Sequence, residues 1–365
     1  MNICLIGNGL PCLILANILI NKNIKISIFE ENASKTKFDT RSLGISKKNI
    51  EFLKKQKINI EKNAWYINKI KIFNETQIKE ILCFGSENDN LFSIIKNFQF
   101  INTLNKNIKK KNLINFIKKK KKVFYDQIIK GETQYDIIIN FNENNEISKE
   151  IFFNRQKKNY NSLAYTTLIK HQKCYNREAY QVFTNKGPIA FLPLSNTETS
   201  IVYSVFNKKV IISDTEIAKL INKYNKKYSI KSFSKIEKFN LKGSILKNYS
   251  YKNILCFGDN IHKIHPLAGQ GLNMTIRDIK ILSKLIDEKI DLGMSLDKSI
   301  LKKFESKTKH FNYLYSNGID FIFDFFKLDS KLNNNYSNKI FKFLDKSALF
   351  KKYSTKFADQ GFLSY

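Results

Sequence analysis

Residues 253 to 277, NILCFGDNIHKIHPLAGQGLNMTIR, decide the fold of this chain. Their pattern predicts a short buried strand over 254–257, a tight turn at Gly258 and an exposed Asp259 carboxylate at the strand end. A proline-glycine loop follows, and an amphipathic helix begins near Gly271. The first N–H groups of a helix have no partner within it, so this one directs free donors at whatever lies against the loop. The stretch suits a flat, electron-rich ring that takes on negative charge, while Asp259 can accept hydrogen bonds from sugar-like hydroxyls.

The N-terminus carries a second motif, a strand, a glycine loop, a helix and another strand in a βαβ pattern. Gly7 allows a tight turn, Gly9 allows close approach of a pyrophosphate to the following helix N-terminus, and the third small residue of the fingerprint is Cys12. Glu30 ends the second strand at the distance expected for an acid that binds ribose hydroxyls. The pattern predicts dinucleotide binding, and an ordinary βαβ turn is the alternative. The predicted elements are a strand over 3–6, a helix over 13–20 and a strand over 24–29.

Composition permits a substantial core but leaves the meaning of the charge open. The chain has 365 residues, 42% of them hydrophobic, and a formal net charge of +31. Its lysines are spread along the whole chain, so biased coding explains the charge as well as an anionic membrane surface or nucleic acid does. A nucleic-acid-binding protein would not require the observed placement of Gly, Pro and Asp.

The cysteines and the apolar runs indicate a reduced, cytoplasmic protein. The five cysteines show no paired metal-ligand spacing and favour reduced thiols in a core. They are Cys4, Cys12, Cys83, Cys174 and Cys256. The longest apolar run, 10–20, is shorter than the roughly 20 residues of a spanning helix, and no export signal is expected.

A third motif makes a family resemblance plain. Asp39-Thr40-Arg41 follows the dinucleotide fingerprint, and the later stretch reads G-D-x-x-H-x-x-H-P-x-A-G-Q-G-L-N-x-x-x-R-D from Gly258 to Asp278. Together these motifs resemble the FAD-dependent aromatic hydroxylases of ubiquinone biosynthesis, the 2-polyprenylphenol hydroxylase type.

The resemblance implies an α/β fold with a Rossmann-like FAD-binding domain, similar to p-hydroxybenzoate hydroxylase, and an interposed, mostly antiparallel β-sheet domain for substrate. The first part of the FAD domain would span 1–150 and its second part 240–300. The sheet domain would span 151–239, and a helical region would span 301–365. Alternating strands over 164–169, 179–184, 189–192 and 201–206 fit such a sheet. Tyr180, Phe183 and Phe191 would then wall an apolar pocket or belong to the core.

The resemblance also implies a site and an activity. Cofactor-binding residues would be Gly7, Gly9, Cys12, Glu30, Arg41, Asp259, Gly269, Gln270, Gly271, Leu272 and Asn273, and the residues nearest the chemistry would be His265 and Pro266. No metal is expected, because His262 and His265 lack further ligands at suitable spacing. NAD(P)H would reduce FAD, O2 would give a flavin C4a-hydroperoxide, and a polyprenylated phenol would be hydroxylated. The substrate implies a peripheral position on the inner membrane, and a quinone-biosynthesis complex is a possible partner.

Two departures from the family pattern motivate an alternative. Asn142 and Glu143 stand where the family has Asp and Gly after the strand over 135–141, and Asn97-Phe98 stands where an Asn-Arg pair is usual. A catalytically degenerate accessory subunit of a quinone-biosynthesis assembly is the alternative interpretation. The aromatic stretch 319–327, which carries lysine, suits either helix packing or a bilayer surface.

Overall fold

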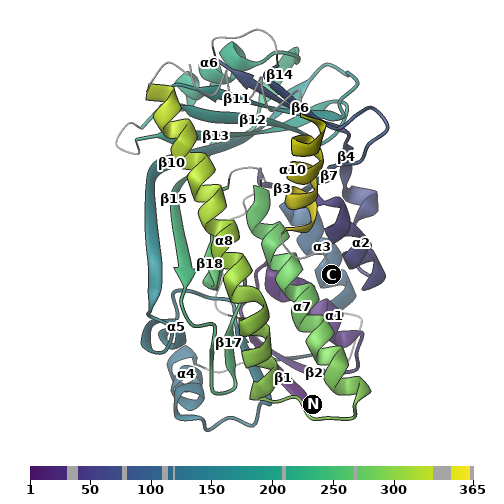
Figure 1. Ribbon diagram of the computed structural model, residues 1–365, viewed down its shortest axis with the longest axis vertical. Helices are drawn as coiled ribbons and strands as arrows, with labels where there is room; N and C mark the ends of the chain where they lie inside the picture. The colour runs from purple at the N-terminus through teal and green to yellow at the C-terminus, as the bar shows by residue number, and fades with distance from the viewer. Residues whose placement is uncertain are drawn as a thin grey trace.

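The computed structural model describes residues 1–30, 40–75, 80–108, 114–117, 120–207, 211–266, 269–331 and 347–361. Two large β-sheets lie at opposite ends of its long axis, and helices α7 (Gln270–Asp291) and α8 (Lys298–Lys331) run side by side along that axis (Figure 1). The predicted glycine loop, Glu30 and Asp259 lie at the carboxyl edge of the N-terminal sheet.

The N-terminal sheet is parallel apart from one short edge strand. Its order is β16-β17-β9-β1-β2-β8, and β16 alone is antiparallel to its neighbour. The strands are β1 (Asn2–Ile6), β2 (Lys25–Phe29), β8 (Ile114–Phe116), β9 (Ile137–Asn140), β16 (Ser250–Tyr251) and β17 (Ile254–Cys256). Because β1, β9 and β17 are covered on both faces, they read as continuous apolar runs.

Helix α1 (Leu10–Ile20) packs between this sheet and its neighbours α3 (Asn97–Ile108) and α7. Ten of its eleven residues are buried, which explains why the segment is apolar on every side instead of amphipathic. The predicted βαβ unit is confirmed. Its strands are adjacent and parallel, with Ile3 opposite Ile26.

The second sheet has the order β18-β15-β10-β13-β12-β11-β5-β6, with β14 also pairing β10. It is antiparallel except where β5 meets β11. The strands are β5 (Lys69–Asn74), β6 (Leu82–Phe84), β10 (Arg155–His171), β11 (Glu178–Thr184), β12 (Gly187–Pro193), β13 (Glu198–Phe206), β14 (Ile230–Phe233), β15 (Glu237–Leu246) and β18 (His262–Lys263). All four predicted strands are present, and β5 and β6 join them from the first 150 residues.

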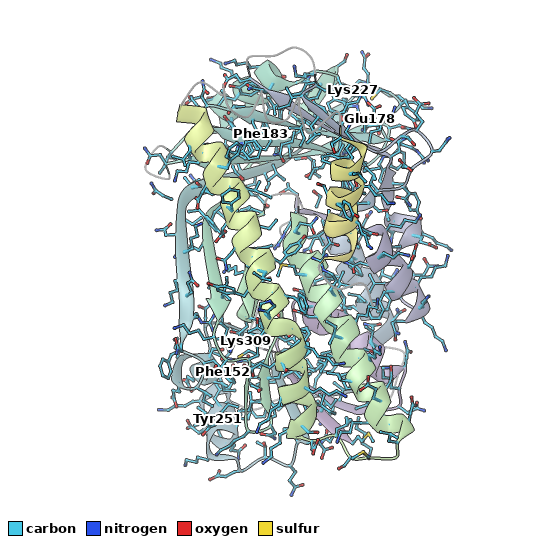
Figure 2. The ribbon with its side chains drawn as sticks, viewed as in Figure 1. Phe152, Glu178, Phe183, Lys227, Tyr251 and Lys309 are labelled. Carbon is cyan, nitrogen blue, oxygen red and sulfur yellow. The ribbon has the colours of Figure 1, made fainter. Side chains whose placement is uncertain are left out.

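One face of this sheet is closed by α6 (Asp214–Tyr224), whose Ile217 and Ile221 are buried in the same cluster as the sheet aromatics. Tyr180 stacks on Phe191 with ring centroids 4.3 Å apart, and Tyr228 extends the stack. Tyr180 and Phe191 are therefore core residues under α6, and of the two roles offered by the sequence they take the structural one. Phe183 instead stacks on Phe326 near the C-terminal end of α8 (Figure 2).

A small antiparallel sheet, β3-β7-β4, connects the two ends. It comprises β3 (Ser42–Ser46), β4 (Trp65–Ile67) and β7 (Phe92–Lys96), and α2 (Lys47–Lys55) follows β3 directly. Ser46 is the N-cap residue of α2, a position where serine commonly caps the helix, but its side chain does not do so here. Its hydroxyl donates to the Asp359 carbonyl of α10 (Ala348–Gln360), so the expected cap bond is replaced by a contact with the C-terminal helix.

The remaining elements are short or peripheral. They are η1 (Glu61–Asn63), α4 (Lys121–Lys130), α5 (Glu146–Glu150) and η2 (Gly258–Asn260). The chain has a run of five lysines at 118–122. Lys118 and Lys119 lie outside the described residues, while Lys120 to Lys122 are exposed at the start of α4. Among the helices of the described residues, none has the length and apolar character to cross a membrane.

Candidate functional site

The loop after β1 leaves the N-terminus of α1 open. Gly7 has φ +136°, and a Cβ there would lie 3.2 Å from Phe141 Cβ, so both its conformation and its surroundings require glycine. Gly9 is exposed at the N-cap of α1 and, as glycine, has no side chain to cap the first N–H groups of the helix. Cys12 is buried beneath the loop, its thiol donates to the Gly7 carbonyl at 3.2 Å, and burial raises its pKa. The loop thus presents bare backbone and an uncapped helix end, which suits an anion.

Two exposed carboxylates flank this helix end. The parallel strands β1, β2, β9 and β17 all end at the same edge of the sheet, and there Glu30 follows β2 while Asp259 lies in η2 after β17. Gly258 has φ +65°, and a Cβ there would lie 3.5 Å from Pro11 Cβ, so the loops after β1 and β17 touch. The edge therefore combines two exposed carboxylates, which suit hydroxyl groups, with one uncapped helix end, which suits an anion.

A second open helix end belongs to α7. Gly269, with φ +64°, is its N-cap and provides no side-chain cap. A Cβ at Gly269 would be 3.8 Å from the Gly44 backbone nitrogen, so the loop lies against β3. Gln270 is buried, and its Oε1 accepts a hydrogen bond of 2.7 Å from the Tyr315 hydroxyl of α8. Leu272 packs on the core of the N-terminal sheet, and Gly271 lies beside Ile264.

Asn273 fastens this loop to β3 and α2. Its amide nitrogen donates to the Gly44 carbonyl at 3.0 Å and to the Gly269 carbonyl at 3.3 Å. Its amide oxygen accepts from the Ser46 N–H and the Asn49 side chain, both at 2.9 Å. The Asn273 side chain is thus occupied in holding together the backbone on either side of the proposed ring position.

His265 lies just before this loop, and its ring is packed in a pocket under α8. Its backbone N–H donates to the Tyr160 hydroxyl at 3.1 Å, and that hydroxyl donates to Asp320 at 2.6 Å. The imidazole packs on Phe323, with ring centroids 4.1 Å apart. Burial lowers the pKa of His265 to about 3, so the ring is neutral at physiological pH. The neighbouring Pro266 is exposed.

His262 has a different role from His265, because it pairs with Asp278 of α7. Its Nε2 is 2.7 Å from the Asp278 carboxylate, and both side chains are buried. Asn312 of α8 donates to the same carboxylate at 3.1 Å. The motif's first histidine and its final aspartate therefore tie the loop to α7 and α8.

Arg41 is exposed at the start of β3, and its carbonyl accepts from the Asn97 N–H at 3.0 Å. Asp39 of the same motif lies outside the described residues, as do residues 267 and 268 of the loop. Asn97 begins α3, and Phe98 next to it is exposed.

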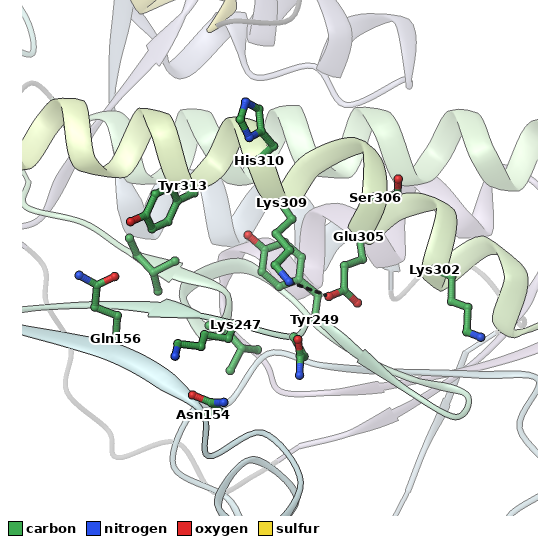
Figure 3. A pocket seen from close by; sticks show the side chains of 13 residues that line it. Asn154, Gln156, Lys247, Tyr249, Lys302, Glu305, Ser306, Lys309, His310 and Tyr313 are labelled. Atoms are coloured by element: carbon green, nitrogen blue, oxygen red, sulfur yellow. Dashed lines mark ion pairs between the residues drawn. The ribbon is translucent and has the colours of Figure 1, made fainter.

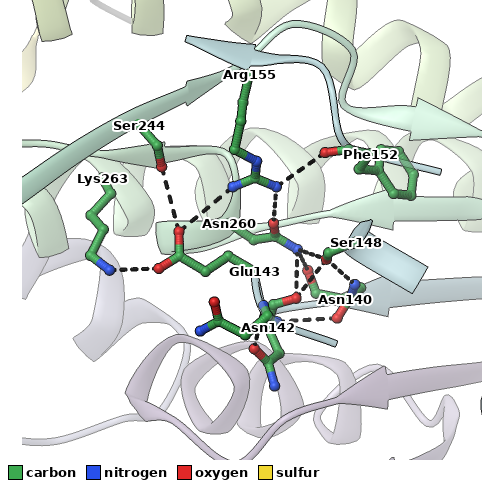
Figure 4. Close-up of polar contacts among 10 residues, drawn as sticks. Asn140, Asn142, Glu143, Ser148, Phe152, Arg155, Ser244, Asn260 and Lys263 are labelled. Carbon is green, nitrogen blue, oxygen red and sulfur yellow. Dashed lines mark hydrogen bonds and ion pairs between the residues drawn. The ribbon is translucent and has the colours of Figure 1, made fainter. Parts of the chain in front are cut away.

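The altered strand end after β9 is a compact polar network (Figure 4). The Asn142 oxygen accepts from the Asn144 N–H at 2.8 Å, which closes a turn. The Glu143 carboxylate accepts from Lys263 at 2.6 Å and lies 3.6 Å from the Arg155 guanidinium. Its charge is thus balanced by two cations from β10 and β18. The buried Asn260 side chain donates to the Asn140 and Asn142 carbonyls and joins this turn to η2.

An apolar surface beside the candidate ring position was not identified from the sequence. Phe92 of β7 lies against Gly44, where a Cβ would be 3.4 Å from its ring. Leu192 and Leu194 come from the end of β12 and pack with Phe92 and Trp65 around buried Ile67 and Ile94. The alternation of side chains along β12 could have indicated this apolar surface, since Leu192 points to the face opposite Phe191.

Comparisons with known proteins give relatives and a domain family for this chain. Residues 155–309 match the family described as FAD binding domain. The chain is 29% identical over 188 residues to the ubiquinone biosynthesis monooxygenase COQ6 of Dictyostelium discoideum, which covers 41% of this chain and 38% of that protein. It is 27% identical over 153 residues to the 3-demethoxyubiquinol 3-hydroxylase of Escherichia coli K12, covering 40% of this chain and 38% of that protein. The matched stretches thus span about two fifths of those relatives' length.

Solved structures share the fold over almost the whole chain. The p-nitrophenol 4-monooxygenase PnpA of Pseudomonas putida DLL-E4 superposes with a TM-score of 0.76 at 11% identity, covering 98% of both chains. HpxO of Klebsiella pneumoniae, solved with FAD and uric acid, superposes with a TM-score of 0.74 at 9% identity, covering 99% of this chain and 96% of that one.

The residues at the sheet edge and at the start of α7 fit FAD on chemical grounds. Two uncapped helix ends suit its pyrophosphate and its electron-rich ring, and the two exposed carboxylates suit its hydroxyls. The expected fold class is confirmed, as is the resemblance to the hydroxylases of ubiquinone biosynthesis. The chain therefore has the p-hydroxybenzoate hydroxylase-like fold of solved FAD-dependent monooxygenases, and residues 155–309 match an FAD binding domain.

Proposed function

We propose that this chain is a monooxygenase that uses FAD, NAD(P)H and O2 to hydroxylate the aromatic ring of a polyprenylated phenol in ubiquinone biosynthesis. The observation that carries the proposal is a pair of uncapped helix N-termini. That of α1 lies with two exposed carboxylates at the carboxyl edge of the N-terminal sheet, and that of α7 lies against β3. The ubiquinone-pathway names of the matched relatives support the choice of substrate class.

Each part of the candidate site has a distinct binding role in this proposal. The backbone at Gly7 and Gly9 with the N-terminus of α1 binds the pyrophosphate, and Glu30 binds ribose hydroxyls. Asp259 binds the ribityl chain. The loop from Gly269 to Asn273 lies along the ring, and the α7 dipole stabilises negative charge on it when reduced. Arg41 contacts the cofactor from the start of β3, and Cys12 supports the glycine loop from below.

Bound FAD supplies the redox chemistry, and the protein positions the substrate and excludes water. The buried, neutral His265 adds no positive charge to the site and supports the loop, while the exposed Pro266 next to it shapes the surface that the phenol meets. Phe92, Leu192 and Leu194 provide an apolar wall for the aromatic ring. No side-chain nucleophile is required.

The substrate's tail implies that the reaction takes place beside a membrane. A polyprenyl chain stays in the bilayer, so the enzyme must reach its substrate at the surface, and the net charge of +31 favours anionic lipid. A cytoplasmic, peripheral position on the inner membrane follows, with a quinone-biosynthesis complex as a further partner.

The alternative of a degenerate accessory subunit rests on Asn142 and Glu143. Lys263 and Arg155 balance the Glu143 charge, so this residue does not by itself prevent FAD from binding. The altered turn still bears on how NAD(P)H approaches. Bound FAD without prenylphenol-stimulated NAD(P)H oxidation would favour this alternative.

The function is tested by incubating the purified protein with FAD, NADPH, O2 and a short-chain prenylphenol, followed by mass spectrometry of the phenol. We expect a product that is heavier by one oxygen atom. Asp259→Ala should weaken FAD binding about tenfold, consistent with the loss of a carboxylate–hydroxyl hydrogen bond. Glu132→Ala is the matched control, because Glu132 is an exposed carboxylate outside the sheet edge. Unmodified phenol from a protein saturated with FAD would refute the proposed activity.

A further inference from the structure

The outward face of α8 changes from cationic to apolar along its length. Its inner side is packed on the protein through Phe304, Phe323 and Phe326, all of which are buried. In its outer half, Leu314, Phe321 and Leu328 are 41%, 72% and 62% exposed. Since these three residues are seven apart, they lie on one side of the helix, about 10 Å from one to the next. An apolar stripe of this kind is unusual on a solvent-facing helix.

Cations precede the stripe on the same helix. Lys303 and Lys307 lie toward its N-terminal half, and Lys302 and Lys309 project beside them. Lys303 is paired with Glu288 at 2.8 Å, and Lys309 lies 3.7 Å from Glu305.

A groove of about 830 Å³ runs beside this cationic half, between α8 and the end of β15 (Figure 3). Lys302 and Lys309 line it from α8, Lys247 lines it from the opposite side, and Tyr313 joins it to the stripe. Its one carboxylate, Glu305, accepts from the Ser250 N–H at 3.1 Å and from the Ser250 hydroxyl at 2.8 Å. Within the described part of the chain, neither Lys247 nor Lys302 has an ion pair, so the groove is a net cationic surface.

We propose that the outer face of α8 and this groove dock on a bilayer that contains anionic phospholipid. Leu314, Phe321 and Leu328 enter the headgroup region, and the groove lysines contact lipid phosphates. A second copy of the chain is a poorer occupant than a bilayer. Symmetric pairing through this face would bring the same lysines together, in a chain of net charge +31.

This inference rests on the proposed function and extends it, because it places the membrane contact on α8, the helix that also contacts the loop from Gly269 to Asn273. Tyr315 of α8 donates to Gln270, and Asp320 accepts from the Tyr160 hydroxyl that supports His265. The binding experiment with vesicles contains neither FAD nor substrate, so a failure to bind vesicles is distinguishable from a failure of the hydroxylase proposal.

The test is co-sedimentation with vesicles of phosphatidylcholine alone and of an equal mixture with phosphatidylglycerol. The full chain should bind the mixed vesicles at least about tenfold more tightly. Replacing Leu314, Phe321 and Leu328 together by serine should weaken that binding by at least about tenfold. The control is Ile211→Ser with Leu292→Ser, because those residues are as exposed, at 68% and 72%, but lie off α8. This control should bind like the original chain.

The electrostatic half has its own pair of variants. Lys247→Glu with Lys302→Glu reverses two groove charges and should lower binding to the mixed vesicles about tenfold. Lys231→Glu with Lys235→Glu makes the same change in net charge away from the groove and should have a much smaller effect. Equal losses for the two pairs would mean that only net charge matters, which overturns the proposed surface.

Insertion itself is measured by fluorescence. Trp65 is the chain's single tryptophan, so Trp65→Phe gives a silent background for Phe321→Trp. On mixed vesicles the emission of Trp at 321 should shift to shorter wavelength and be quenched by brominated lipid, while Ile211→Trp should not respond. An unresponsive Phe321→Trp would refute insertion. A change in oligomeric state on loss of the stripe, measured without vesicles, would assign the face to a second copy and also overturn the proposal.

Discussion

Asn273→Ala is expected to separate the two backbone segments that border the candidate ring position. The side chain makes three hydrogen bonds of 2.9 to 3.0 Å, to the Ser46 N–H, the Asn49 amide and the Gly44 carbonyl, and a longer one of 3.3 Å to the Gly269 carbonyl. Asn273 is 3% exposed, so water does not readily replace these partners.

The size of the effect follows from those contacts. Each of the three short bonds contributes about 1 kcal/mol net, the long bond contributes less, and the better helix propensity of alanine returns about 0.5 kcal/mol. The free energy of unfolding should therefore fall by about 3 kcal/mol, a large share of the total for a typical domain. Asn273→Asp keeps the size and the acceptor but turns an oxygen toward the Gly44 and Gly269 carbonyls, so it should destabilise to a similar extent.

The assay is urea unfolding of the FAD-free chain, so that ligand binding does not add to the measured stability. A separate titration then follows quenching of FAD fluorescence, and we expect at least about tenfold weaker binding, because Gly44 and Gly269 are no longer held together. Asn317→Ala is the control. Among the described residues, that side chain bonds only within its own helix, to the Tyr313 carbonyl. A loss below about 1 kcal/mol for Asn273→Ala, with unchanged FAD binding, would refute the bridging role.

Three further predictions concern the residues around the loop. Tyr160→Phe removes the hydroxyl that joins the His265 N–H to Asp320, so the free energy of unfolding measured in urea should fall by about 1–3 kcal/mol. Tyr203→Phe is the control. It removes a 3.3 Å contact with Thr184, so the fall should be less than about 1 kcal/mol. Glu143→Gln should lower the free energy of unfolding by about 1 kcal/mol at low salt and by less at high salt, because it removes two ion pairs. FAD affinity should stay unchanged within about twofold. Tighter FAD binding would show instead that the carboxylate repels the cofactor. The pKa of His265 is about 3 in the folded protein, below its value in the unfolded chain. Its contribution to the free energy of unfolding is therefore fully present above the unfolded pKa and is lost as the pH falls toward 3. Stability should drop by roughly 2 kcal/mol between pH 7.5 and 5 through this residue, and His265→Leu should remove that part of the pH dependence while the exposed His310→Leu does not.

The sequence was sufficient for the parts of the fold that depend on local pattern. Gly7, Gly9 and Glu30 fix a βαβ unit because a glycine loop, a buried helix and an acid at the next strand end occur in the order that a parallel sheet needs. The strand at 254–257 and the helix after it were predicted within one residue of their starts, since Gly258 and Gly269 mark both turns with positive φ.

Contacts between distant segments were not predictable from local pattern. Ser46 stands at a helix N-cap, yet its hydroxyl bonds to Asp359, which is 313 residues away. Tyr180 and Phe191 alternate as a pocket wall would, but α6 covers that face, and the open-face residues Leu192 and Leu194 are the ones beside β3 and β7. The balance of Glu143 by Lys263 and Arg155 likewise depends on the pairing of β10, β15 and β18.

The most direct test of the proposed function is an absorbance spectrum of the purified chain with FAD, followed anaerobically after NADPH addition with and without a short-chain prenylphenol. A working hydroxylase should show a bound flavin spectrum that bleaches faster when the phenol is present. Bound flavin that NADPH does not bleach under either condition would contradict the hydroxylase and favour the accessory role. Failure to bind added FAD would contradict the assignment of Gly7, Glu30 and Asp259.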